Sequence, residues 1–466
     1  MILLCWKSPK YGDQQKRDSK MIKRNAEKRI KDWIANGKDA LLIEGARQTG
    51  KTYLVRECLN EYGDYVELNF IERPELIELF KTGTSANDIV MRLSVASGRT
   101  LLPGRTIIFL DEVQACSEIV TMIKFLVEEG SFRYIMSGSL LGIELKDLRS
   151  APVGYMSTIK MYPLDIMEFM AAVGFPPDVF EMIQDCYEKK KEVDTFVHNR
   201  LIDAFYLYLI VGGMPEAAQV YLDTNDIMRV SEIHDKIIDL YKLDFAQYEQ
   251  NNKLKLREIY DAVPSELEEK NKRFYINHLG NKAEYEKYSD DFLWLKNAGV
   301  VLPVYNAKEL RLPLMMSEKR NLFKLFMSDI GLLTSRYSNQ VKYQILQKDK
   351  NIKNGGLFEN VVAQELAAHG VKTWYYNSKK LGELDLVIES EGHVLPIEVK
   401  SGKDYKKHNA LNNVLANDAY DAERALVLYN GNLVCKENIT YMPIYMASCI
   451  RDNKPESMIY SLRWTE

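Results

Sequence analysis

The sequence predicts an α/β protein of several domains, and three observations support this fold class. Short apolar runs alternate with helical periodicity between residues 21 and 170, which is typical of a parallel sheet covered by helices. The pattern from about 175 to 245 is helical, apart from one Gly-Gly break. A second alternation of helix and strand begins near residue 355. A chain of 466 residues has room for about three such units.

The composition excludes several classes of protein. Apolar residues make up 46% and charged residues 27% of the chain, values typical of a globular protein and not of a disordered one. No apolar stretch approaches the roughly 20 residues of a membrane helix, so we expect no membrane partner. The six cysteines show no C-x-x-C spacing, which predicts reduced thiols, no zinc site and a cytoplasmic location. A net charge of −4 argues against binding nucleic acid by bulk charge alone.

Five apolar runs in the first part are predicted to be the strands of the parallel sheet. They cover residues 40–43, 65–70, 106–110, 133–137 and 158–161. Short apolar runs bounded by polar or turn residues are typical of buried strands. Because ligands bind at the carboxyl ends of the strands in open α/β sheets, the residues that follow these runs are candidates for a binding site.

A phosphate-binding loop follows the first run. Its residues are Gly45, Ala46, Arg47, Gln48, Thr49, Gly50, Lys51 and Thr52, which complete the pattern G-x-x-x-x-G-K-T. Glycines let the backbone N–H groups of such a loop turn toward a triphosphate, beside the positive end of the following helix. Lys51 is then placed to reach the β- and γ-phosphates, and the Thr52 hydroxyl is placed to ligate Mg²⁺. We therefore expect ATP and Mg²⁺ as cofactors.

Polar residues also end the third and fourth runs. Asp111 is expected to hold Mg²⁺, and Glu112 is expected to polarise the water that attacks the γ-phosphate. The fourth run ends at Ser137, followed by a glycine and Ser139, and either serine could contact the γ-phosphate. An ordinary Ser-Gly-Ser turn explains the same residues equally well.

A second set of charged residues lies after residue 355. Glu359 falls on a predicted helix and Asp385 on a following strand. Glu398 and Lys400 are two residues apart on the next strand, so they project from one face. Asp385 and Glu398 are expected to bind a divalent cation, with Glu359 completing the acid shell. Lys400 would orient a water or stabilise charge on a phosphate. The solvent face of an ordinary hairpin gives the same spacing and remains the alternative.

Two clusters of basic residues are candidates for contact with nucleic acid. The residues after the E-x-K strand include Lys403, Lys406 and Lys407, which offer a local patch for phosphate. Lys270, Lys272 and Arg273 precede an aromatic pair, but three glutamates lie just upstream of them. This second cluster fits either a nucleic-acid contact or a structural lid between domains.

Several of these motifs resemble those of bacterial and archaeal AAA-type ATPases. The similar segments are Gly45–Thr52, Leu110–Gln114, Ser137–Leu141, Met161–Leu164, Gly212–Glu216 and Phe323–Leu333. In that family a P-loop domain is followed by a winged-helix-like segment and by a C-terminal domain of unknown function. The arrangement after residue 355 resembles the core of PD-(D/E)XK nucleases, with Glu-Leu-Asp as its leading motif.

The resemblance implies five segments along the chain. Residues 1–20 precede a natural domain start at Met21 and are expected to be a flexible or misassigned extension. The other expected segments are a P-loop ATPase core (21–170), a helical lid (171–245), a winged-helix-like segment (246–340) and a restriction-endonuclease-like α/β domain (341–466).

One position departs from the family pattern. Relatives carry a basic residue after the glycine that matches Gly154, and this chain has Tyr155 there. Arg149 and Arg47 are the nearby substitutes for an arginine-finger-like contact. We therefore expect hydrolysis to be slow or dependent on a partner.

Two functions agree with the sequence. The first is an ATP-gated enzyme that binds or cuts DNA at the acid–lysine set, which the intact set favours. The second is a signalling or defence-type switch, in which the ATP state controls association with a protein partner or a second copy and the nuclease-like domain is inactive. Balanced charge and the tyrosine at position 155 favour this second function.

Overall fold

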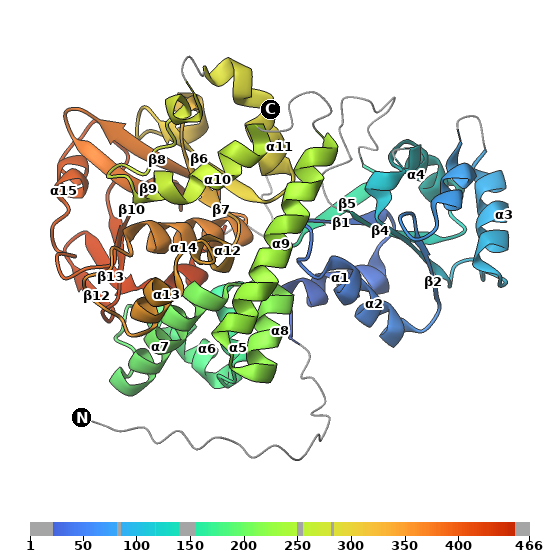
Figure 1. The fold of residues 1–466 in the computed structure, drawn as a ribbon, viewed down its shortest axis with the longest axis horizontal. Coiled ribbons are helices and arrows are strands. Elements are labelled where there is room, and N and C mark those ends of the chain that lie inside the picture. Colours follow the sequence, from blue (N-terminus) through green and yellow to red (C-terminus); the bar gives the residue numbers. More distant parts are fainter. Residues whose placement is uncertain are drawn as a thin grey trace, which may run out of the picture.

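The computed structural model describes residues 22–81, 85–116, 118–138, 154–248, 255–280 and 284–452. The extension expected at residues 1–20 lies outside this part of the chain. Two sheets stand on opposite sides of the molecule, and the long helix α9 runs between them (Figure 1). No single helix in the ranges described here is long and apolar enough to cross a membrane. Helices α7 (Thr195–Val211) and α8 (Pro215–Thr224) pass that test only as a pair, by length and composition, and the pair is bent by 119°.

The first sheet consists of five parallel strands in the order β2-β3-β4-β1-β5. Its strands are β1 (Ala40–Glu44), β2 (Tyr65–Asn69), β3 (Ile107–Asp111), β4 (Arg133–Gly138) and β5 (Met156–Lys160). All five predicted runs are therefore strands, and the predicted parallel α/β fold is confirmed. Every residue of β1 and β3 is buried, as expected for strands covered on both faces.

Helices cover both faces of this sheet (Figure 1). They are α1 (Asn25–Asn36), α2 (Lys51–Tyr62), η1 (Pro74–Phe80), α3 (Ala86–Ser97), η2 (Val113–Ala115) and α4 (Glu118–Glu129). Two separate apolar clusters fill the two faces, one with α1 and α2 and the other with α3 and α4. The loop between β1 and α2 is thereby held at the carboxyl edge of the sheet.

A helical region follows the first sheet. The stretch predicted at about 175–245 corresponds to α6 (Pro177–Lys189), α7 (Thr195–Val211), α8 (Pro215–Thr224) and α9 (Ile227–Tyr248), and it is flanked by α5 (Ile166–Ala172) and α10 (Lys255–Glu268). The expected break falls between α7 and α8, where Gly212 has a φ of 68°. A Cβ on Gly213 would lie 2.2 Å from the carbonyl oxygen of Leu164, so the backbones touch there.

The second sheet has eight strands in the order β12-β13-β11-β10-β9-β8-β6-β7. They are β6 (Val301–Ala307), β7 (Glu318–Met327), β8 (Thr373–Ser378), β9 (Gly382–Ser390), β10 (His393–Lys400), β11 (Ala425–Tyr429), β12 (Val434–Lys436) and β13 (Ile439–Pro443). The remaining elements are η4 (Ile276–Leu279), α11 (Tyr285–Asn297), η5 (Leu314–Ser317), α12 (Ile330–Thr334), α13 (Asn339–Leu346), α14 (Gly355–Ala368), α15 (Asn409–Leu415) and η6 (Ile444–Cys449).

Strands β6 and β7 lie in the segment expected to be winged-helix-like (246–340), and both belong to this second sheet. β6 pairs with β7 on one side and, in parallel, with β8 on the other, where Tyr305 lies opposite Trp374. The apolar side chains of β6 and β7 join the core that surrounds α14. The boundary expected between residues 340 and 341 would therefore divide a single hydrogen-bonded sheet. Strands β6 and β7 remain in that sheet because there they bury apolar side chains that an isolated wing would expose.

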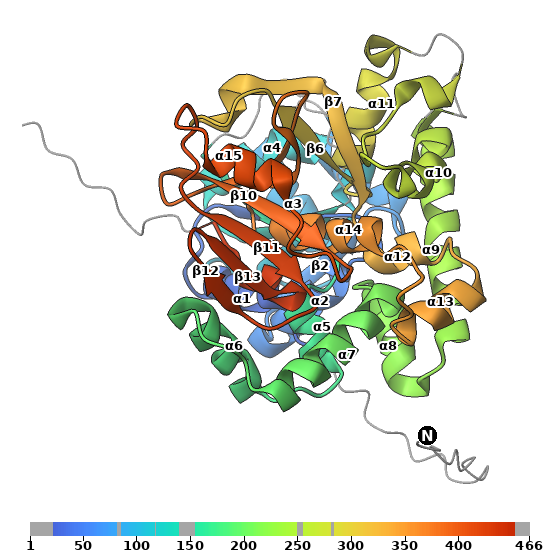
Figure 2. The same ribbon diagram turned by 90° about the vertical axis from the view of Figure 1, so that its left-hand side faces the viewer.

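Helix α14 lies against β7 and β10 of the second sheet and against α12 (Figure 2). It buries polar side chains that bond to several other elements. Asn360 Oδ1 accepts from the N–H of Met327 at 2.8 Å, and Gln364 Oε1 accepts from the N–H of Ile330 at 2.9 Å. Glu365 Oε1 accepts from the N–H of Ile166 in α5 at 3.0 Å. Helix α14 thus connects the second sheet with α5, the helix that follows the first sheet.

Candidate nucleotide site and acid–lysine cluster

The loop between β1 and α2 has the backbone that a phosphate site needs. Gly50 has a φ of 85°, in the left-handed region that favours glycine. A Cβ on Gly45 would lie 2.1 Å from the carbonyl oxygen of Met161, so only glycine fits there. Helix α2 begins directly after the loop at Lys51, and its N-terminus faces the same place. Backbone N–H groups and a helix N-terminus together favour an anion.

Lys51 is buried in the loop. Its Nζ donates to the carbonyl oxygens of Gly45 at 3.0 Å and Ala46 at 2.8 Å. Burial lowers the pKa of Lys51 to about 8, although Glu112 and Asp111 act in the opposite direction. A bound phosphate would stabilise the charged ammonium and so raise the pKa of Lys51.

Asp111 is the centre of a polar cluster at the ends of three strands. It is 1% exposed and accepts hydrogen bonds from Thr52 Oγ1 at 3.0 Å, from Asn69 Nδ2 at 2.9 Å and from the Ser137 hydroxyl. Burial raises the pKa of Asp111, and the hydroxyl of Ser137 acts against that shift. The structure therefore brings Thr52, Asp111 and Ser137 together, whereas Asn69 was not foreseen although it ends a predicted strand.

The donor set of this cluster suits Mg²⁺. The Thr52 hydroxyl and the Asp111 carboxylate are hard oxygen ligands, and Asn69 and Ser137 orient the carboxylate. Thr52 and Asp111 are the residues that would hold the cation beside a nucleotide. The cation would neutralise charge on the phosphates.

Glu112 lies next to the cluster in a left-handed backbone conformation, with a φ of 59°. The Gln114 side-chain amide donates to its carboxylate. Gln114 in turn is held close to the end of β4, because a Cβ on Gly138 would lie 2.7 Å from Gln114 Oε1. Glu112 is thus oriented by a neighbour and remains half-exposed. Ser139 and Arg149 lie outside the described residues.

The two positions discussed for an arginine-finger-like contact have other partners. Arg47 forms an ion pair with Asp244 of α9, with 2.5 Å between Nη1 and Oδ1, and its carbonyl accepts from the Tyr241 hydroxyl at 3.0 Å. The Tyr155 hydroxyl donates to Glu128 at 2.6 Å. Arg47 therefore ties the loop to α9.

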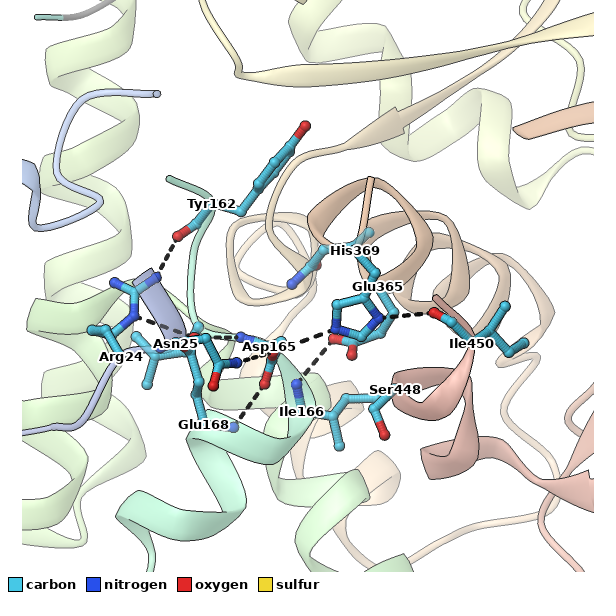
Figure 3. Close-up of polar contacts among 12 residues, drawn as sticks. Arg24, Asn25, Tyr162, Asp165, Ile166, Glu168, Glu365, His369, Ser448 and Ile450 are labelled. Carbon is cyan, nitrogen blue, oxygen red and sulfur yellow. Dashed lines mark hydrogen bonds and ion pairs between the residues drawn. The ribbon is translucent and has the colours of Figure 1, made fainter. Parts of the chain in front are cut away.

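Arg24, just before α1, contacts the phosphate loop and the segment that leads into α5. Its guanidinium donates to the carbonyl oxygens of Thr49 at 3.0 Å and Tyr162 at 2.6 Å. It also pairs with Glu168 of α5 at 3.2 Å, and Figure 3 shows Arg24 beside Tyr162 and Glu168. No motif of the sequence marks Arg24, because Tyr162 and Glu168 lie about 140 residues away along the chain.

The network around Arg24 continues to α14 (Figure 3). Asn25 donates from its side chain to Asp165 Oδ2 at 2.8 Å, and His369 Nε2 lies 3.4 Å from the same oxygen. Burial alone would raise the pKa of Asp165, but His369 and the hydrogen bonds hold it below its usual value. Burial and the nearby Asp165 raise the pKa of Glu365 well above its usual value. These contacts link the loop to the C-terminal end of α14.

The N-terminal half of α14 carries the first member of the acid–lysine cluster. Glu359 is 1% exposed, and its carboxylate contacts Lys272 Nζ at 2.6 Å and Lys324 Nζ at 3.2 Å. Lys324 is fully buried and also contacts Glu383 at 3.0 Å. Neither lysine was assigned to this site from the sequence: Lys272 was one of the ambiguous basic residues, and Lys324 lay in a strand.

The strands β9 and β10 supply the other members. Asp385 Oδ2 accepts from the N–H of Val399 at 2.9 Å, and Lys400 Nζ lies 2.6 Å from Glu398 Oε2. Burial would raise the pKa of Asp385, but Lys324 and its neighbours hold it below the usual value. Burial and Asp385 raise the pKa of Glu398 to about 8. The structure therefore gathers Glu359, Asp385, Glu398 and Lys400, as predicted from their order along the chain.

The cluster does not have the form of a metal site. No group of three or more His, Cys, Asp or Glu side chains that could hold a metal ion occurs among the residues with assigned positions. Lysine ammonium groups lie against the carboxylates of Glu359 and Glu398 instead. The expected ligation of a cation by Asp385 and Glu398 does not fit this arrangement, and we derive no metal-dependent step from it.

The fold and the first site define a P-loop nucleoside-triphosphate-binding domain. Strand β4 lies between the loop strand β1 and the acidic strand β3, with Lys51 and Asp111 facing the same edge. Residues 37–170 match the family model of an AAA domain. Residues 37–170 are therefore similar to AAA domains and have the fold of a P-loop nucleotide-binding domain.

Two further family models match, both of them domains of unknown function: DUF8612 over residues 202–342 and DUF4143 over residues 354–447. No curated protein matches the chain. Similar solved structures include a Walker-type ATPase of Pyrococcus abyssi, with 15% identity, a TM-score of 0.40 and coverage of 68% of this chain and 97% of that one. The Aeropyrum pernix Orc1 protein in complex with DNA shows 13% identity and a TM-score of 0.29, with coverage of 71% and 93%. Thermotoga maritima RuvB T158V shows 15% identity and a TM-score of 0.29, with coverage of 62% and 89%.

We expect Arg24→Ala to weaken ATP binding by roughly ten-fold, because the Thr49 carbonyl and the Glu168 carboxylate lose a charged hydrogen-bond donor. Titration with a fluorescent ATP analogue measures the affinity, and thermal unfolding reports on stability in parallel. Lys28→Ala, at an exposed position of α1, is the matched control. An unchanged affinity in a folded Arg24→Ala protein would contradict the bracing role.

We also expect the Glu398 carboxyl to make stability depend on pH. Its pKa of about 8 lies above that of the unfolded chain, so the folded protein holds an extra proton. This contribution is complete below the unfolded pKa and is lost as the pH rises through the folded pKa. The free energy of unfolding of the wild type should therefore fall relative to Glu398→Gln between about pH 5 and about pH 8 in denaturant titrations, and change little above that range. Parallel curves for the two proteins would refute the assignment.

Proposed function

We propose that this protein is an ATP hydrolase whose nucleotide state controls a C-terminal site for DNA. The observation that carries the proposal is the polar connection between the two sites. Arg24 contacts the phosphate loop at Thr49, and its network reaches Glu365 and His369 at one end of α14. Glu359 lies nearer the other end of the same helix, in the acid–lysine cluster.

The ATP site contains the groups that phosphoryl transfer requires. Lys51 would bind the β- and γ-phosphates, and Thr52 and Asp111 would hold Mg²⁺. Glu112, oriented by Gln114, would position the attacking water and accept its proton. Mg²⁺, when bound, neutralises charge that develops on the phosphates.

A change in the loop would be passed on through its braces. Phosphate binding draws Lys51 away from the carbonyl oxygens of Gly45 and Ala46, which it contacts at 3.0 and 2.8 Å. The loop then shifts against Arg24, whose guanidinium also holds Glu168 and Tyr162. Because these groups are buried and bonded, a shift at one of them requires the others to follow.

The C-terminal cluster offers positive charge to a phosphodiester. Lys400 ends β10 and its side chain is 26% exposed, so its ammonium can leave Glu398 for a phosphate oxygen. These features support binding of DNA.

A switch that acts through protein contacts is the second candidate. Glu359 is neutralised by Lys272 and Lys324, and the described residues hold no group of carboxylates that could bind a metal. A cluster of this kind can stabilise the domain without chemistry. In that case ATP would control association with a protein partner or with a second copy of the chain.

Variants of the ATP site test the first half of the proposal. Lys51→Ala should lose ATP affinity by about ten-fold or more, because a charged donor to the phosphates is removed. Glu112→Gln should bind ATP normally and turn over about a hundred-fold more slowly, because it cannot accept a proton. Isothermal titration and phosphate-release assays measure these effects. Equal turnover by wild type and Glu112→Gln would place the catalytic base elsewhere.

A DNA assay with and without ATP distinguishes the two candidate functions. Supercoiled plasmid, linear duplex and single-stranded DNA are incubated with the full chain in Mg²⁺ buffer, beside Lys51→Ala and Lys400→Ala. Binding or nicking that needs ATP and is lost in both variants supports the first function. Phosphate release from ATP without any effect on DNA, in wild type and Lys400→Ala alike, supports the second. Lys436→Ala, at an exposed position of β12, is the control for loss of surface charge.

A further inference from the structure

A pocket of about 800 Å³ opens at the carboxyl ends of β10 and β11. Its wall comes from four separate parts of the chain: α7, the segment before α14, and the turns after β10 and β11. Lys400 is the last residue of β10, and Ser401, Gly402 and Lys403 continue directly into the wall. Asn354, the residue before α14, also lines it. The pocket thus lies at the same strand ends as the acid–lysine cluster.

The pocket has a positive rim. Lys350 and Lys403 line it, are exposed, and form no ion pair with any residue whose position is described. Lys348 also lines it, pairs with Asp203 and lies 5.6 Å above the ring of Tyr206. Unpaired lysines beside a cleft attract phosphate groups.

An aromatic platform forms one side of the pocket. The ring of Tyr405 stacks on that of Tyr429, with centroids 4.6 Å apart and an interplanar angle of 29°. Tyr429 is fixed in turn: its hydroxyl donates to the Asn432 carbonyl at 2.7 Å, and a Cβ on Gly431 would come within 2.3 Å of its ring. Tyr405 is only partly buried. A supported and accessible tyrosine ring is a surface on which a nucleobase can stack.

Two acceptors in the wall have no partner. Asn354 Oδ1 and Asn430 Oδ1 are buried, make no hydrogen bond, and belong to residues that line the pocket. Asn354 is 4% exposed. The Asn430 amide nitrogen donates to the Tyr206 hydroxyl at 2.9 Å, which fixes the side chain and leaves its oxygen as an acceptor. Buried acceptors without partners are costly, so a ligand with N–H donors would stabilise this pocket.

We infer that this pocket binds one unpaired nucleotide of a DNA strand, with its base on Tyr405 and its backbone leading to Lys400. Lysines for the phosphate, a ring for the face of the base and two acceptors for N–H groups at its edge match the phosphate and the base of a nucleotide. A base in a duplex has its Watson–Crick N–H donors paired and its faces stacked, so paired DNA does not fit. The inference rests on the proposed function, because it takes DNA as the substrate of the C-terminal domain.

The test uses the full chain and a single-stranded oligothymidylate that carries 2-aminopurine at its 3′ end. The buffer contains EDTA and no ATP, so that no cleavage is needed. Fluorescence anisotropy gives the affinity, and 2-aminopurine emission reports stacking of the base. We expect the single strand to quench on binding and to bind more tightly than a blunt duplex of the same length.

Variants separate stacking from charge. Tyr405→Ala should weaken single-strand binding by roughly ten-fold or more and abolish the quench, whereas Tyr405→Phe should retain both. Lys403→Ala should weaken binding and reduce the slope of the salt dependence by about one, while leaving the quench. Tyr343→Ala and Lys436→Ala, at exposed positions outside the pocket, are the matched controls.

The outcomes distinguish this inference from the proposed function. Equal binding of single strand and duplex without a quench overturns the pocket, even if ATP-dependent action on plasmid DNA persists. The same holds if a folded Tyr405→Ala protein binds and quenches like the wild type. A quench lost in Tyr405→Ala and kept in Tyr405→Phe supports the pocket. It does so even where the plasmid assay shows no ATP-dependent effect and the proposed coupling fails.

Discussion

The buried polar face of α14 is the constraint on which the two halves of the molecule depend. Each polar side chain on it must have a partner, because an unpaired buried group costs about 1–3 kcal/mol. Those partners lie on different elements: Glu359 contacts Lys272 and Lys324, Asn360 contacts β7, Gln364 contacts α12, and Glu365 contacts α5. The helix therefore cannot shift along one neighbour without breaking bonds to another, and motion in the molecule has to be concerted.

At the C-terminal end of α14, Glu365 has one bonded carboxyl oxygen and one without a partner. Glu365 is fully buried, accepts one hydrogen bond through Oε1 and has no partner at Oε2. Burial and the nearby Asp165 raise the pKa of Glu365 well above its usual value, because an unpaired charge in the core is costly. Burial also raises the pKa of Glu168, and Arg24 opposes that shift. Release of Arg24 would remove the opposing cation and raise the pKa of Glu168 further.

The sequence predicted the features that depend on local pattern. The five parallel strands follow from apolar runs, and the cluster of Thr52, Asp111 and Ser137 follows from strand ends meeting at one edge. Features that depend on distant pairing were missed. The place of β6 beside β8 is set by core packing, which periodicity does not reveal. Lys324 carried no predicted role, yet it is buried and three acidic residues from other elements surround it.

The pairing of the loop arginines limits what the ATP site can do alone. Arg24 contacts the loop and Arg47 lies in it, and both are engaged, with Glu168 and with Asp244. Among the described residues of the loop, Lys51 is then the side-chain cation left to stabilise charge on the γ-phosphate beside Mg²⁺, and phosphoryl transfer gains much of its rate from a further cation such as an arginine. Asp244 keeps one buried oxygen without a partner, so its hold on Arg47 is incomplete. We therefore expect fast turnover to require that Arg47 leave Asp244, or that an arginine outside the described residues or on another molecule reach the site.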